Sequence, residues 1–137
     1  MKIVVATSNK GKLEEFKRIL EPLSIEAISP SELGIEMHVD ETGEAFSENA
    51  RIKAKDLFEK TGLPTVADDS GLCVDAMGGR PGVKTARYAG ADSTYAEKFA
   101  KMLGELDGVP KNERTAAFVC GICCVLDEST MIETVGS

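Results

Sequence analysis

Long apolar segments are missing from this chain of 137 residues. Its longest apolar run, residues 116–126, is too short to span a bilayer. The chain begins with the charged, strand-like Met1-Lys2-Ile3 and not with a signal peptide. Its composition, 42% hydrophobic and 28% charged residues, is that of a soluble globular protein. We therefore expect one cytoplasmic domain, residues 1–137, that does not associate with a membrane.

Positive charge is also scarce. The chain has 16 Lys and Arg residues against 23 Asp and Glu residues, which gives a formal net charge of −7. Nucleic-acid backbones are bound by clustered Lys and Arg, so this balance argues against a nucleic acid as partner. A small phosphate compound can still bind if lysines, helix N-termini or a divalent metal lie between it and the carboxylates.

Histidine is nearly absent, and cysteine is placed where it packs. His38 is the single histidine and lies outside the motifs described below, so no Ser-His or Cys-His pair suggests nucleophilic catalysis. Cys120 and Cys123 have C-x-x-C spacing, but with Cys124 they lie inside the apolar run, and no second ligand pair completes a zinc site. We interpret them, and Cys73, as core residues.

The N-terminal segment has the pattern of a strand, a polar loop and a helix. Residues 2–7 form a β-branched apolar run typical of a buried strand, and apolar residues recur at helical spacing over 13–20, ahead of Pro22. Between them lie Thr7, Ser8, Asn9, Lys10, Gly11 and Lys12. A loop at a helix N-terminus presents backbone N–H groups, and its lysines add charge, so a phosphate fits there. The loop lacks the P-loop pattern, and a capped turn with solvated lysines is the alternative.

A pair of carboxylates, Asp68 and Asp69, follows the apolar Val66 and Ala67 and precedes Ser70. We interpret Val66 and Ala67 as the end of a buried strand, where a carboxylate pair needs a cation. Adjacent side chains on an extended backbone point to opposite faces, so one aspartate can ligate a metal while the other faces water or substrate. The alternative is a solvated turn.

Two more acidic residues, Asp40 and Glu41, precede a long helical pattern. Thr42 is the expected N-cap of that helix. On its polar side Lys53 is placed to reach a bound phosphate, and the alternative for Lys53 is an exposed lysine on a solvated face.

The rest of the chain predicts an α/β fold. Residues 24–29 read as a second strand reached by a βαβ-type crossover, and residues 115–126 and 130–135 as a hairpin. A capping box at Thr94 starts a helix in which Phe99 and Leu103 are expected to face the core.

Together these segments resemble the family of non-canonical purine nucleoside triphosphate pyrophosphatases, also called inosine or xanthosine triphosphate pyrophosphatases. The resemblance extends from Met1 to about Val135. It rests on five ordered motifs: Thr7-x-Asn9-x-x-Lys12; Glu41-Thr42-Gly43; Phe46-x-Glu48-Asn49-Ala50 with Lys53-Ala54; Ala67-Asp68-Asp69-Ser70-Gly71-Leu72; and Gly78-Gly79-x-Pro81-Gly82 running into Ala86-Arg87-Tyr88-Ala89-Gly90.

The resemblance implies an activity and a set of roles. The activity is hydrolysis of ITP, dITP or XTP to the monophosphate and pyrophosphate with Mg²⁺. The fold is α/β, with a mixed, elongated central sheet flanked by helices and two lobes with a cleft between them. The resemblance also implies that the protein usually forms a homodimer. Thr7 to Lys12 and Lys53 would hold the phosphates, and Ser70 would touch substrate. Glu41 and Asp69 would bind magnesium, with Asp40 and Asp68 as weaker candidates, and Asp69 would be the general base.

The chain also departs from that family's pattern. Family members continue into a Phe-Gly-Tyr-Asp motif and a later Ser-His-Arg motif that contact the base, whereas this sequence stops at Ser137 without either. We therefore expect the second lobe to be incomplete at the C-terminus and the base-contacting half of the site to be absent. The alternative function is a shortened nucleotide-binding or dimer-forming protein with weak or no turnover.

Overall fold

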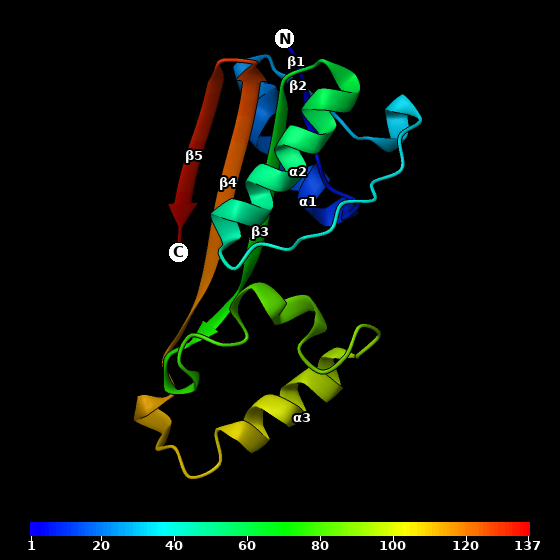
Figure 1. Cartoon of the computed structure of the whole chain (residues 1–137). Coiled ribbons are helices and arrows are strands. Elements are labelled where there is room, and N and C mark those ends of the chain that lie inside the picture. The colour runs from blue at the N-terminus through cyan, green and yellow to red at the C-terminus, as the bar shows by residue number, and fades with distance from the viewer. The chain divides into compact units, whose positions relative to one another are not determined.

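The computed structural model describes all 137 residues, which fall into two compact units (Figure 1). The first comprises Met1–Asp69 and Gly121–Val135, and the second comprises Ser70–Cys120 with Gly136–Ser137. None of the helices has the length and apolar character needed to cross a membrane.

A five-stranded sheet in the order β2-β1-β3-β4-β5 is the centre of the fold. Its strands are β1 (Lys2–Val5), β2 (Glu26–Ile28), β3 (Thr65–Val74), β4 (Ala116–Asp127) and β5 (Thr130–Gly136). β1 pairs in parallel with both β2 and β3, as βαβ crossovers require. β4 and β5 are joined by two residues and run in opposite directions in Figure 1, which confirms the predicted hairpin and makes the sheet mixed.

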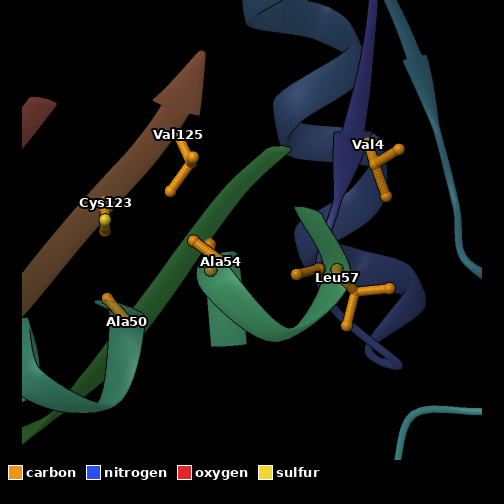
Figure 2. Close-up of a cluster of buried hydrophobic side chains, with 8 residues drawn as sticks. Val4, Ala50, Ala54, Leu57, Cys123 and Val125 are labelled. Atoms are coloured by element: carbon orange, nitrogen blue, oxygen red, sulfur yellow. The ribbon is translucent and has the colours of Figure 1, made fainter. Parts of the chain in front are cut away.

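In the first unit, α1 (Lys10–Leu20) and α2 (Phe46–Thr61) pack on opposite faces of the sheet. Side-chain alternation in β1 separates the two cores: Ile3 and Val5 pack with α1, whereas Val4 packs with α2. The α2 side, drawn in Figure 2, is formed by Val4, Ala6, Ala50, Ala54, Leu57, Ala67, Cys123 and Val125. These two cores hold in place the loop that follows β1 and the loop that precedes α2.

The start of α2 differs from the expectation. Thr42 is not the N-cap; the cap position is Ala45, whose side chain makes no capping hydrogen bond. Side chains from the first turn reach back instead: Glu48 Oε2 accepts the N–H of Glu44 at 3.0 Å, and Asn49 Oδ1 accepts that of Gly43 at 2.7 Å. The loop before α2 is therefore fastened to the helix by the helix's own side chains.

In the second unit, α3 (Tyr95–Glu105) begins at the predicted capping box of Thr94 and Glu97. Its apolar residues do not all face a core, however. Phe99 is 61% exposed and Leu103 59% exposed, so the expectation for these two is wrong. Leu106, just after the helix, is buried with Val74 and Met77.

All four cysteines are free thiols, and Cys123 is completely buried in the core against α2. Burial raises the pKa of Cys123 to about 11. A thiol in this state is a poor nucleophile and a poor metal ligand, which confirms the core interpretation for Cys123. Cys124 is partly buried against the α1 side of the sheet, and Cys73 and Cys120 are partly exposed and belong to neither core.

Candidate active site

The polar loop after β1 is a capped turn. Asn9 is the N-cap of α1, and its Oδ1 accepts the N–H groups of Gly11 at 2.8 Å and Lys12 at 3.2 Å. Thr7 Oγ1 accepts the N–H of Asn9 at 3.1 Å. The prediction that this loop presents unpaired N–H groups is therefore wrong for Gly11 and Lys12, because the side chain of Asn9 already satisfies them.

The capped-turn alternative supposed solvated lysines, but the side chain of Lys12 is only partly exposed and is paired. Its Nζ lies 2.8 Å from Oδ2 of Asp68, whose side chain is nearly buried. The ion pair connects α1 to β3 on the α1 face of the sheet. It places one positive charge beside the loop of Thr7 to Asn9.

Asp68 and Asp69 lie in the interior of β3, which continues to Val74, so their expected place at a strand end is wrong. Both residues are buried, at 5% and 7% exposed. Buried carboxylates are tolerated when they are paired or hydrogen-bonded. Here Asp68 pairs with Lys12, and Asp69 Oδ2 accepts a hydrogen bond from Asn49 Nδ2 at 2.9 Å. The alternative of a solvated turn is thus wrong as well, and the expected opposite orientation of the two side chains is confirmed.

Lys53 lies on the buried face of α2 with Asn49, Ala50 and Leu57. It is 8% exposed, and its Nζ lies 2.9 Å from Oε1 of Glu41. The expected place of Lys53 on the polar side of the helix is therefore wrong, and so is the alternative of an exposed lysine on a solvated face. The Glu41 segment and α2 are held together by this second ion pair.

Asp69 is the perturbed acid of the site. Its pKa is raised, first by burial and then by the negative charge of Glu41, while the hydrogen bond from Asn49 and the charges of Lys53 and Lys12 oppose the rise. A carboxylate with a raised pKa is a stronger base than an exposed aspartate once it is ionised. The raised pKa is compatible with the role of Asp69 as a general base, which stays a prediction.

A cavity of about 230 Å³ brings most of the predicted residues together. It is lined by Ala6, Thr7, Ser8, Asn9, Lys12, Met37, Val39, Glu41 and Lys53. Lys10 instead lines a neighbouring cavity of about 480 Å³ that also includes His38. Gly11 and Asp69 line neither, and Ser70 belongs to the second unit, so its contact with substrate stays a prediction. Met37 and Val39 form apolar walls of the smaller cavity. No pattern in the sequence indicated that these two residues would line the site.

Glu41 and Asp69 are the two carboxylates predicted to ligate Mg²⁺. The structure has no group of three or more His, Cys, Asp or Glu residues able to hold a metal. Glu41 and Asp69 nevertheless lie close enough for the charge of Glu41 to raise the pKa of Asp69. Magnesium is usually bound through one or two carboxylates, with waters and substrate phosphates as the other ligands. Glu41 and Asp69 are carboxylates of the kind that such a site uses, and they stay the predicted ligands, with Asp40 and Asp68 as the weaker candidates.

The fold and the cavity describe an α/β protein in which two lysines and a glutamate line a cavity beside the loop that follows its first parallel strand. The chain belongs to the Ham1 family, whose sequence profile matches residues 3–137. It is 43% identical to the dITP/XTP pyrophosphatase of Bacillus licheniformis over 129 residues, which are 93% of this chain and 66% of that protein.

Solved structures agree with this assignment. The HAM1 protein of Coxiella burnetii superimposes with a TM-score of 0.90 at 38% identity, covering 99% of this chain and 70% of that one. The nucleoside-triphosphatase, dITP/XTP pyrophosphatase, of Mycobacterium abscessus superimposes with a TM-score of 0.85 at 41% identity, covering 99% and 71%. This chain spans about 60 to 66% of the length of the curated relatives it matches.

Proposed function

We propose that the protein hydrolyses non-canonical purine nucleoside triphosphates, such as ITP, dITP and XTP, to the monophosphate and pyrophosphate. One observation carries the proposal: Lys12 and Lys53, from two different helices, line one small cavity with Glu41, and the buried Asp69 responds electrostatically to all three. Relatives named dITP/XTP pyrophosphatase, at 43 to 47% identity, supply the substrate class.

Binding of the triphosphate starts with an exchange of partners. In the free protein the ammonium groups of Lys12 and Lys53 are held by Asp68 and Glu41 at 2.8 and 2.9 Å. Phosphate oxygens compete with these carboxylates for the same N–H donors. The lysines are therefore ordered and partly desolvated before substrate arrives, which lowers the entropic cost of binding.

Asp69 provides the base. It accepts a proton from water while the water oxygen attacks the α-phosphorus, and the bond from that phosphorus to the bridging oxygen breaks, releasing pyrophosphate. Mg²⁺, when held by Glu41 and Asp69, would neutralise charge on the phosphates. Lys12 and Lys53 stabilise the negative charge that accumulates on the leaving pyrophosphate.

Product analysis tests the reaction. ITP and Mg²⁺ are incubated with the protein, and pyrophosphate and orthophosphate are measured separately. We expect pyrophosphate and IMP in equal amounts. Stepwise release of orthophosphate with accumulation of IDP would rule the reaction out. Calorimetric binding of ITP without release of pyrophosphate by the same sample would support the alternative, a nucleotide-binding protein with weak or no turnover.

We include a cytoplasmic homodimer in this proposal. Ile132 and Val135 on the edge strand β5 are 55% and 60% exposed and offer apolar surface for a second copy. Light scattering coupled to gel filtration measures the oligomeric state directly. A monomeric mass at all concentrations used in the activity assay would exclude the dimer.

A further inference from the structure

Asn49 connects two parts of the site that are distant in sequence. It lies in the first turn of α2 and is 1% exposed. Its Oδ1 accepts the N–H of Gly43 at 2.7 Å, and its Nδ2 donates to Oδ2 of Asp69 at 2.9 Å. One side chain thus bridges the Glu41-Thr42-Gly43 segment, named here the acidic loop, and the middle of β3.

We propose that Asn49 is a positioning residue that fixes the carboxylate of Asp69 relative to the acidic loop, so that Asp69 and Glu41 approach the same phosphate. This inference rests on the function proposed above. The side chain of Asn49 is 1% exposed and both of its polar ends are already hydrogen-bonded within the protein, so it acts through Asp69 and the loop and not by contact with substrate.

The chemistry of the bridge requires an amide of this length. The N–H of Gly43 needs an acceptor, and the carboxylate of Asp69 needs a donor. Aspartate at position 49 would set two carboxylates against each other, leucine would leave both partners unsatisfied, and glutamine would add a methylene to a buried position. Asparagine supplies both functions in one orientation.

Gly43 provides independent support for a tight fit. A Cβ added there would lie 2.7 Å from Oδ1 of Asn49 and 2.7 Å from Cβ of Glu48. The backbone of the acidic loop therefore packs against the first turn of α2 so closely that only glycine fits. The adjacent bond from the Glu44 N–H to Glu48 Oε2, at 3.0 Å, fixes the same approach. Alanine at position 43 must displace the bridge while leaving Asn49 itself unchanged.

Two variants test the proposal in the full chain. Asn49→Leu removes both hydrogen bonds at nearly constant volume, and Gly43→Ala displaces the amide sterically. For each we expect kcat for ITP to fall roughly tenfold to a hundredfold, as for other residues that orient catalytic groups through hydrogen bonds. KM for ITP should stay within about threefold, because the lysines are unchanged. Gly104→Ala is the matched glycine control, since its Cβ would meet nothing within 4 Å.

A purely structural Asn49 predicts a different result, in which both variants unfold at lower temperature but keep wild-type kcat per folded molecule. That result would overturn the proposal.

The half-saturating Mg²⁺ concentration should rise in both variants and not in the control, because the two expected metal ligands are no longer held together.

Amide hydrogen exchange tests the bridge without any activity. Asp69→Ala removes the anchor of Asn49 Nδ2, so the Gly43 amide should exchange several-fold faster, whereas the Gly34 amide, elsewhere in the unit, should not change. Unchanged exchange at Gly43 would overturn the proposal even if the wild-type protein releases pyrophosphate. If the wild type releases none, the proposed function fails, and this measurement still decides whether the bridge exists.

Discussion

Replacing Asp69 by asparagine separates its charge from its shape. The amide oxygen can still accept the hydrogen bond that Asn49 Nδ2 donates at 2.9 Å, so the local packing is kept. The side chain can no longer accept a proton from water. Loss of a general base costs on the order of a hundredfold or more in rate, about 2.7 kcal/mol of transition-state stabilisation.

The same change has a predictable sign in stability. Burial and the charge of Glu41 raise the pKa of Asp69 in the folded protein. In the unfolded chain Asp69 has the ordinary pKa of an aspartate. At a pH between that value and the raised pKa, the folded protein binds a proton that the unfolded chain has lost, so the free energy of unfolding falls as the pH rises. Above it, the wild type retains the cost of a buried charge that the Asp69→Asn variant lacks. Without metal, the unfolding temperature of the variant relative to wild type should therefore increase as the pH rises above the ordinary pKa of an aspartate.

Two assays check these expectations. Pyrophosphate release from ITP gives kcat, and thermal unfolding with EDTA across the pH range gives the relative stability. Near-normal turnover of Asp69→Asn at ordinary Mg²⁺ would refute the role as a base. A relative unfolding temperature that does not vary with pH would refute the raised pKa.

Three further substitutions have defined outcomes. Gly121→Ala places a Cβ 2.7 and 2.8 Å from backbone atoms of the first turn of α2, so it should lower stability by roughly 1–3 kcal/mol in urea unfolding, whereas Gly104→Ala should not. Lys53→Met removes the partner of Glu41 and one phosphate donor, so steady-state kinetics should give a KM for ITP at least about tenfold higher; an unchanged KM would contradict the site. Leu57→Ala opens a cavity in a completely buried position and should cost about 2–5 kcal/mol, measured as a lower urea midpoint.

The parallel part of the fold was predictable from the sequence because its signals are local. The apolar run of β1, the helical spacing of α1 and the short segment of β2 define a βαβ unit with little ambiguity. The opposite orientation of Asp68 and Asp69 follows from strand geometry in the same way. These features need no knowledge of tertiary contacts.

The partners of the charged residues were not predictable, because each contact joins segments far apart in the chain. Nothing near Lys12 in sequence indicates that it pairs with Asp68, or that Asp69 is satisfied by Asn49. Without those partners, two buried carboxylates inside a strand are unfavourable, so a strand end was the reasonable expectation.

Local patterns were also misleading at two helices. Thr42 has the chemistry of an N-cap, but Glu48 and Asn49 satisfy the loop before α2 from inside the helix. The apolar spacing in α3 correctly identified an apolar face, yet spacing does not specify what covers it, and Phe99 is largely exposed.

The central claim is that water attacks the α-phosphorus of the nucleotide. Hydrolysis of ITP in water enriched in oxygen-18, followed by mass spectrometry of both products, tests it directly. Attack at the α-phosphorus predicts one heavy oxygen in IMP and none in pyrophosphate. Heavy oxygen in pyrophosphate, with unlabelled IMP, would contradict the claim.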